Sequence, residues 1–137
     1  MKYSIHSWVA FLLLCSFTIG GCATTQKAPD AVTLQVEYRW TAAHKCSSIS
    51  PEIRLTGVPP ATKQLRVTLT DLDVPSYNHG GGRVKYEGSN IIPAGALKSY
   101  VGPCPPSGTH KYSIKVDALD ASGIIIGTGS KTLPCCP

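Results

Sequence analysis

The chain has 137 residues, of which 42% are hydrophobic and 15% are charged, a balance typical of a globular domain. Its 13 basic and 8 acidic residues give a formal net charge of +5, but the Lys and Arg residues form no continuous run. This distribution argues against a nucleic-acid-binding protein. We interpret the excess charge as a solvated surface that also favours anionic headgroups.

The first 22 residues predict an export signal. Lys2 places a positive charge near the start, and residues 8–17 are almost wholly apolar. That run is shorter than the roughly 20 residues of a permanent membrane helix but suits a secretory signal peptide. It is followed by residues 19–22 (IGGC), which resemble a bacterial lipobox. We predict a signal peptide over 1–21 and a diacylglycerol on Cys22; the alternative is an ordinary signal peptide with Cys22 incidental.

A lipid on the chain would place it in a bacterial cell envelope. Ala23, rather than Asp, follows the lipid-bearing cysteine, which favours outer-membrane sorting in an organism with two membranes. We therefore predict a lipid-anchored protein of the outer membrane that faces the periplasm. Residues 22–31 are small and polar and are predicted to be a lipidated tether, which leaves a single domain over 32–137.

Four cysteines remain in the predicted mature domain, and an even number in an exported domain favours disulfides. They are Cys46, Cys104, Cys135 and Cys136. Because adjacent cysteines fit disulfide geometry poorly, we expect Cys46 and Cys104 each to pair with one member of the C-terminal pair. Which pairs with which stays open. A thiolate metal site is the less favoured alternative, because no Cys-x-x-Cys spacing is present, and we predict no metal and no cofactor.

Alternating apolar and polar residues predict strands at 33–40, 65–70 and 111–118. Val84 and Tyr86 suggest another short strand, and residues 124–126 (III) suit a strand buried on both faces. Residues 120–123 (DASG) are typical of a hairpin turn. The three glycines at 80–82 break a helical pattern and by themselves suit a flexible loop. No stretch has a sustained helical period, so the predicted fold class is an all-β sandwich.

Three stretches resemble the phosphatidylethanolamine-binding protein family, also called Raf kinase inhibitor-like proteins. Residues 50–65 (SPEIRLTGVPPATKQL) resemble the family's Ser-Pro…Gly-Val-Pro…Thr-Lys-Ser-Leu segment, and residues 71–75 (DLDVP) resemble Asp-Pro-Asp-Ala-Pro. Residues 100–112 (YVGPCPPSGTHKY) resemble Tyr-x-Gly-Pro-x-Pro-Pro-x-Gly-x-His-Arg-Tyr. The resemblance covers residues 50–120 and implies a Greek-key β-sandwich with a small anion pocket. The family's C-terminal helix would have no room, because the sequence stops at Pro137.

The resemblance also implies which residues bind the ligand. They are Asp71, His110 and Tyr112, with His79 in the place of the family's second histidine. The chain departs from the family here, because His79 is followed by glycines rather than by Trp. The aromatic residue that lines the family's pocket is therefore missing, and we expect a wider mouth. Lys111 replaces the family's Arg, which keeps the charge but loses the planar fork.

The chemistry of these residues suits a phosphate-sized anion. Protonated imidazole supplies both charge and a donor near neutral pH, and a tyrosine hydroxyl adds a second donor. Asp71 would orient a histidine and favour its charged form. By themselves the same residues also suit structural roles: Asp71 a strand-end turn, His110 a partly buried histidine and Tyr112 a core position. His44 lies outside the motifs and is given no role.

Three functions compete. The first is a lipid-anchored ligand-binding or regulatory domain that binds an anionic small molecule or a phospholipid headgroup. The second is an envelope protein-interaction or structural domain with a vestigial pocket, whose protein partner the sequence does not name. The third is a hydrolase that uses Ser76 or Ser107 with His110 and Asp71, although the sequence has no Gly-x-Ser-x-Gly elbow. We favour the first function and do not expect an enzyme.

Overall fold

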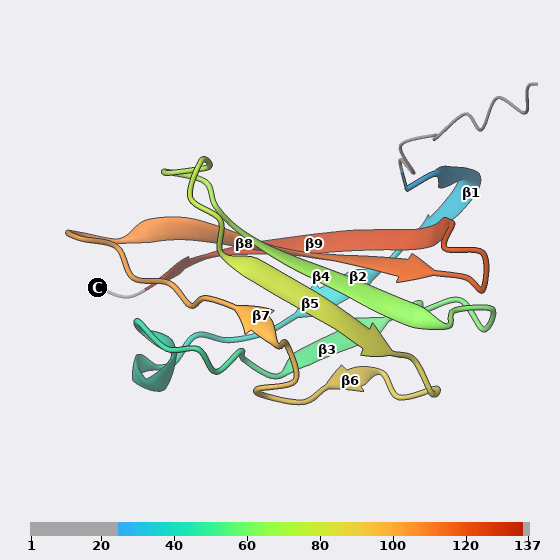
Figure 1. Ribbon diagram of the computed structural model, residues 1–137, viewed down its shortest axis with the longest axis horizontal. Coiled ribbons are helices and arrows are strands. Elements are labelled where there is room, and N and C mark those ends of the chain that lie inside the picture. The colour runs from blue at the N-terminus through green and yellow to red at the C-terminus, as the bar shows by residue number, and fades with distance from the viewer. Residues whose placement is uncertain (1–24, 136–137) are drawn as a thin grey trace, which may run out of the picture.

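A computed structural model describes residues 25–135, which fold into two packed β-sheets (Figure 1). The larger sheet has six strands in the order β1-β9-β8-β4-β5-β7, and the smaller has three in the order β2-β3-β6. Apart from the short 3-10 helix η1 (Ala42–His44), the elements are strands. They are β1 (Lys27–Thr33), β2 (Gln35–Glu37), β3 (Ile53–Thr56), β4 (Gln64–Asp71), β5 (Gly80–Lys85), β6 (Ile91–Ile92), β7 (Ser99–Tyr100), β8 (His110–Leu119) and β9 (Ile125–Cys135).

The core lies between the two sheets and follows the predicted alternation. Along β4 the buried apolar side chains are Leu65, Val67 and Leu69, and the residues between them are more exposed. The neighbouring strand β8 of the same sheet contributes Tyr112, Ile114 and Val116, and the small sheet contributes Val36, Ile53 and Leu55. Burying such side chains is the main driving force for this fold, at about 1.5–3 kcal/mol for each one fully buried. The predicted all-β sandwich is confirmed.

The β4–β8 pair is the most regular part of the large sheet. The two strands run antiparallel in continuous register from Gln64 opposite Leu119 to Asp71 opposite Tyr112. The predicted hairpin turn is also present, because the Gly123 amide donates to the Asp120 carbonyl at 3.1 Å. The predicted strand at 33–40 is divided, since Thr33 ends β1 and β2 begins at Gln35.

Residues 27–31 belong to the domain rather than to the predicted tether. They lie in β1, which pairs in parallel with the start of β9, with Lys27 opposite Ile125. The partner strand lies about 100 residues away in the sequence, so it leaves no local signal. The small polar residues of this segment therefore resemble a tether although they form a strand. Ala23, Cys22 and the predicted signal peptide over 1–21 lie outside the described residues.

The three glycines at 80–82 form the start of strand β5 rather than a flexible loop. A Cβ on Gly80 would meet the Ser99 carbonyl oxygen at 1.8 Å, and one on Gly81 would meet the Val67 carbonyl oxygen at 2.0 Å. Gly80 also has φ +65°, which favours glycine. The glycines therefore allow β5 to lie close against β4 and β7.

Strand β9 is longer than the short apolar run predicted at 124–126. Residues 127–135 (GTGSKTLPC) carry two glycines and a proline, so they read as turn rather than strand. Strand β1 pairs with β9 only as far as Thr128, and beyond that point β9 has one partner, β8, among the described residues. An edge strand tolerates Pro134 because its outer edge needs no hydrogen bonds.

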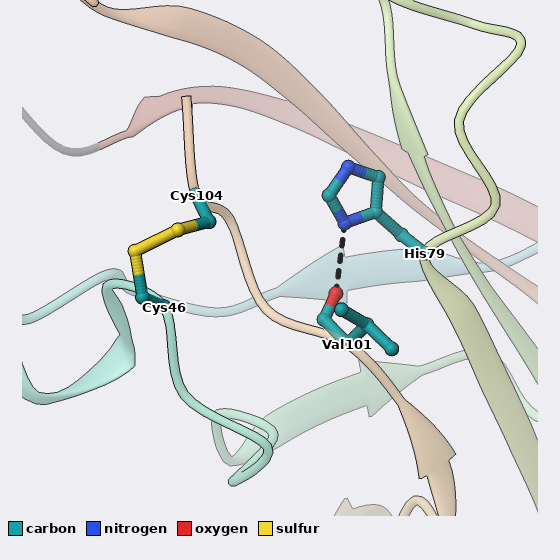
Figure 2. Close-up of a disulfide and its surroundings, with 4 residues drawn as sticks. All are labelled: Cys46, His79, Val101 and Cys104. Atoms are coloured by element: carbon teal, nitrogen blue, oxygen red, sulfur yellow. Dashed lines mark hydrogen bonds between the residues drawn. A yellow bond between two sulfur atoms is a disulfide. The ribbon is translucent and has the colours of Figure 1, made fainter. Parts of the chain in front are cut away.

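The disulfide prediction is wrong. Cys46 pairs with Cys104 across 58 residues and joins the loop after η1 to the segment between β7 and β8 (Figure 2). The two loops meet directly, since the Cys46 amide donates to the Pro103 carbonyl at 2.7 Å, whereas the Cys135 side chain lies in the core. Cys135 is disulfide-bonded too. Cys136 lies outside the described residues. No helix between residues 25 and 135 is long and apolar enough to cross a membrane.

Candidate ligand-binding site

Three of the four predicted site residues lie where β4 ends and β8 begins. Asp71 is the last residue of β4 and pairs in register with Tyr112, the third residue of β8. His110 opens β8, and residues two apart on a strand point to the same face. The rings of His110 and Tyr112 are accordingly stacked, with centroids 6.3 Å apart. The most regular ladder of the fold thus places all three side chains together.

Asp71 is buried and accepts three hydrogen bonds. Its Oδ2 accepts from His110 Nδ1 at 2.8 Å, and its Oδ1 accepts from the backbone amides of Asp73 at 2.9 Å and Val74 at 3.1 Å. Burial alone would raise the pKa of Asp71, but the bonds from His110 and the two amides lower it below its ordinary value. Asp71 therefore closes the strand-end turn and binds the histidine at the same time. The structural role and the site role of this residue do not exclude each other.

The Asp71 bond determines which nitrogen of His110 meets a ligand. An ionised carboxylate can only accept, so His110 Nδ1 carries the hydrogen. Nε2 is then the ring nitrogen available to a ligand, as an acceptor when the ring is neutral and as a donor when it is protonated. The pair can thus present a charged donor to an anion.

His79 lies opposite, just before β5, and is held by a different loop. Its Nδ1 donates to the Val101 carbonyl at 2.8 Å, and its other ring nitrogen points away from Val101 (Figure 2). The imidazole is 4% exposed and lies between two aromatic rings, with centroid distances of 4.6 Å to Tyr77 and 5.3 Å to Tyr112. Its tautomer is therefore also fixed, with Nε2 free.

Tyr77 supplies the aromatic side chain that the sequence analysis predicted to be missing. It precedes His79 by two residues rather than following it, which is why the family pattern did not reveal it. Its side chain packs on His79 and lines the same cavity, although Tyr77 as a whole is 55% exposed. The cavity is therefore bounded on this side by a partly exposed aromatic ring.

The four predicted residues line one cavity of about 370 Å³. This volume falls within the range of small-molecule sites. The remaining walls are mostly apolar and include part of the disulfide. They are formed by Val74, Tyr77, Cys104, Pro105 and Pro106.

The Tyr112 hydroxyl is buried at this cavity and makes no hydrogen bond of good geometry. The Asp71 carboxylate and the Cys104 backbone are its nearest polar neighbours, and burial, reinforced by Asp71, raises the pKa of Tyr112 far above its ordinary value. The hydroxyl therefore stays protonated and keeps a donor for a ligand. Tyr112 is at once a core residue, fully buried, and a cavity residue.

A metal ion fits this site less well than an anion. Donor atoms of Asp71, Asp73 and His110 lie within 4.8 Å of one another. Yet both Asp71 oxygens already accept hydrogen bonds, and Asp73 Oδ2 accepts the Lys111 amide at 2.7 Å. An ion would have to displace these bonds. Neither serine of the hydrolase alternative, Ser76 or Ser107, lines the cavity, so that alternative gains no support.

A second cavity, of about 590 Å³, lies near β2 and η1 and contains His44. The His44 Nδ1 accepts the Thr41 amide at 2.9 Å, and burial lowers the pKa of this histidine. No residue of the Asp71 network lines this cavity. His44 is therefore a suitable control histidine for the candidate site.

Comparisons with known proteins agree with the fold and the motifs. The family model described as phosphatidylethanolamine-binding protein matches residues 24–133. A relative described as a UPF0098 protein, from Methanothermobacter thermautotrophicus, is 31% identical over 93 residues. That match spans 53% of this chain and 62% of the relative, so the chain covers less than two thirds of the relative's length.

Two solved structures are similar in fold. One is a putative phosphatidylethanolamine-binding protein homolog from Chlamydia trachomatis, with a TM-score of 0.61 and 20% identity over 79% of this chain and 99% of that one. The other is Escherichia coli YbcL, described as a new member of the mammalian family, with a TM-score of 0.58 and 21% identity over 74% of this chain and 96% of that one.

The fold and the cavity define a β-sandwich domain of a ligand-binding type. The family match covers most of the chain and includes the strands that carry Asp71, His110 and Tyr112. The chain therefore belongs to the phosphatidylethanolamine-binding protein family.

Proposed function

We propose that this protein is a lipid-anchored domain of the bacterial envelope that binds a small phosphate-bearing anion. The observation that carries this proposal is the set of polar groups that one cavity brings together. His79 and His110 each have Nδ1 in a hydrogen bond, which leaves Nε2 for a ligand, and the Tyr112 hydroxyl is buried without a good partner. A buried polar group normally has a partner, so the Tyr112 hydroxyl beside two imidazoles favours a polar ligand.

Anion binding at these groups couples to proton uptake. With Nδ1–H in place, neutral imidazole offers only a lone pair at Nε2, which repels an anion. Protonation converts Nε2 to a donor and adds positive charge. We therefore expect the affinity for an anion of constant charge to rise as the pH falls.

The apolar walls restrict what the anion is attached to. Pro105, Pro106, Val74 and Tyr77 face the same space as the two histidines. A free inorganic ion would leave these walls in contact with water, whereas a phosphate monoester with a short apolar or aromatic group would cover them. Phosphoethanolamine and small aryl phosphates are suitable probes for this class.

The cavity lies at the end of the sandwich remote from the N-terminal strand. Lys27 of β1 pairs with Ile125 at the start of β9, whereas His110 pairs with Cys135 at its end (Figure 1). Ten residues of strand separate the two positions, or about 33 Å at 3.3 Å per residue. A domain tethered through Cys22 would hold the cavity away from its own membrane. This favours a soluble ligand, or a headgroup in a facing membrane, and it suits the proposed periplasmic orientation.

The alternative is a protein-interaction domain, and one observation favours it. Apolar side chains on the loops that border the cavity are exposed: Leu72 at 48%, Tyr77 at 55% and Val101 at 45%. Apolar groups gathered around a cavity are typical of interaction sites. Under this alternative, substitution of the cavity histidines would leave partner binding unchanged, whereas Leu72→Ser and Val101→Ser would weaken it.

The test is an NMR titration of the chain from residue 23 onward, which keeps every described residue. Sulfate is the first probe because its charge is constant from pH 5 to 8; phosphate, phosphoethanolamine and phosphatidylethanolamine vesicles follow. We expect saturable shifts at Asp71, His79, His110 and Tyr112 that weaken above pH 7. His110→Ala should reduce affinity at least tenfold, equivalent to about 1.4 kcal/mol, and His44→Ala should not.

Two results would count against the proposal. The first is the absence of shifts at millimolar concentrations of any of the soluble probes, which would leave the fold without a working anion site. The second is an equal loss of affinity in the His44→Ala control, which would place the ligand elsewhere. The lipid anchor has its own test: a Cys22→Ala chain should no longer incorporate a labelled fatty acid in a bacterial host.

A further inference from the structure

The wall of the cavity that faces β8 is made by a loop, residues 101–106, rather than by a strand. This loop connects β7 to β8. It contributes Cys104, Pro105 and Pro106 to the cavity lining, and its Val101 carbonyl holds the His79 imidazole. One segment therefore both shapes the cavity and sets which nitrogen of His79 faces a ligand.

The loop depends on a second loop to hold its position. The Gly102 amide donates to the Ser47 carbonyl at 2.9 Å, and the Cys46 amide donates to the Pro103 carbonyl at 2.7 Å. Gly102 packs so closely that a Cβ there would meet the Ser47 carbonyl oxygen at 2.4 Å. The covalent bond between these two loops is the Cys46–Cys104 disulfide, which Figure 2 shows beside the His79–Val101 hydrogen bond.

The disulfide is open to thiol attack. Both of its cysteines are exposed. A further cavity of about 290 Å³ is lined by Cys46 and Cys104 and also shares Tyr77 with the candidate ligand site. Cys135 differs in this respect, because it is 1% exposed. Exchange requires access to a sulfur atom, and the exposed Cys46 and Cys104 offer that access.

Cys46 also has a backbone reason to move once the bond is broken. Its φ of +53° makes it the one non-glycine residue between 25 and 135 with a positive φ. That left-handed conformation is unfavourable for a residue with a side chain, and surrounding structure has to maintain it. With the disulfide cut, no covalent bond would join the two loops, and hydrogen bonds and packing alone would hold them together.

The geometry points to the Cys46–Cys104 disulfide as a thiol-exchange site that controls the ligand cavity, its substrate class being a dithiol such as a Cys-x-x-Cys oxidoreductase. In the disulfide form, the 101–106 wall is fixed and His79 is oriented. In the dithiol form, the wall separates from the loop around Cys46, and His79 loses its partner. The control of ligand affinity rests on the proposed anion site, whereas the release of the wall does not.

The exchange balances in two steps. A thiolate of the dithiol attacks one cysteine sulfur, a mixed disulfide forms, and the other cysteine leaves as a thiolate that takes up a proton. The second sulfur of the dithiol then loses its proton and attacks the mixed disulfide, which releases the remaining cysteine as a thiol. The dithiol is oxidised to its own disulfide, and the protein gains two electrons and two protons.

The first measurement tests the release of the wall without any ligand. The chain from residue 23 onward is compared by NMR in the oxidised form, after treatment with dithiothreitol, and as the double variant C46A/C104A. We expect amide exchange at Gly102 to accelerate at least tenfold, and the His79 ring signals to change from one tautomer to an average of two. Unchanged Gly102 exchange and His79 signals in both the reduced form and the double variant would overturn the inference.

The second measurement tests affinity, with sulfate as the probe. Reduction and the double variant should each weaken sulfate binding about tenfold. A tenfold change corresponds to about 1.4 kcal/mol, which is the contribution of one hydrogen bond to the ligand. Dithiothreitol should have no further effect on the double variant. A further loss there would assign the effect to the Cys135 bridge and overturn the inference. If the oxidised chain binds no sulfate, phosphate or phosphoethanolamine, the proposed function fails, and the first measurement alone decides whether the exchange site stands.

Discussion

The cavity has a strand-built half and a loop-built half, and the two are held together by different means. Asp71, His110 and Tyr112 form the strand-built half, on the continuous β4–β8 ladder. His79 and the 101–106 wall form the loop-built half, which is held by a few hydrogen bonds and one exposed disulfide. A ladder opens only with the whole sheet, whereas a loop can open locally.

This difference indicates that the geometry of the strand-built half is constant and that the geometry of the loop-built half can change. The charged pair and the buried hydroxyl lie where the domain is most rigid, so they supply a preformed anchor. The second histidine and the mouth lie where local changes leave the core intact. A site built in this way can keep its chemistry while its affinity is controlled, and the following predictions test that separation.

The largest expected effect on stability comes from the loop-built half. The variant C46A/C104A removes a link across 58 residues, and the chain-entropy relation gives about 4 kcal/mol for a closed loop of that length. We expect urea unfolding to show a loss of about 3–4 kcal/mol while the circular dichroism spectrum keeps its β-sheet form. A loss below about 1 kcal/mol would mean that the unfolded chain is already compact near these loops.

In the strand-built half, Asp71→Ala should cost about 2–4 kcal/mol, because it leaves His110 and two backbone amides without their acceptor in a buried place. Asp120→Ala is the matched control. Asp120 also accepts two backbone amides, from Ser122 and Ile124, but in an exposed turn at the far end of β8. We expect its loss to stay near about 1 kcal/mol. Equal losses in urea unfolding would contradict the special role given to Asp71.

Acid should weaken the strand-built half through Asp71. Although burial opposes it, hydrogen bonding lowers the pKa of Asp71 below its model-compound value of 3.8, so its stabilising effect is present above that value. The effect is lost as the pH falls through the lower pKa of the folded state. Asp117 follows the same rule, because Thr128, Arg66 and Lys115 outweigh its burial and lower its pKa.

The measurement is the unfolding free energy from pH 7 down to pH 2. Asp71→Asn should lose less stability over this range than the unsubstituted chain, because the residue no longer titrates. Asp117→Asn, also on the β4–β8 pair, should likewise lose less stability than the unsubstituted chain. Comparison of the two variants separates the contribution of Asp71 to the acid dependence from that of Asp117. An unaltered acid slope in Asp71→Asn would show that its carboxylate is not the titrating group.

The smallest expected effect on stability comes from Tyr112→Phe. The hydroxyl is buried without a good partner, so its removal should change the unfolding free energy by less than about 1 kcal/mol. Sulfate binding should nevertheless weaken about threefold to tenfold if that hydroxyl donates to the ligand. Stability that falls while sulfate affinity is unchanged would restrict Tyr112 to a core role.

Much of the strand-built half could be predicted from the sequence, because its signals are local. Period-two burial along β4 and β8 located both strands, and the motif residues at their ends located Asp71, His110 and Tyr112. Steric alternation and a turn-forming carboxylate depend on neighbours within a few positions, so a single sequence carries them. The same local signals identified the turn at residues 120–123.

The features that only the tertiary structure determined depend on contacts between residues that are distant in the chain. The parallel β1–β9 pairing brings a tether-like segment into the sheet, and the glycines at 80–82 become a strand because β4 and β7 approach them closely. The Cys46–Cys104 pairing likewise follows from two loops meeting 58 residues apart. The alternation of residues determined the class of domain, and the resemblance of the motifs to a family indicated the site residues. Long-range packing, which leaves no local pattern, determined the loops that complete the cavity.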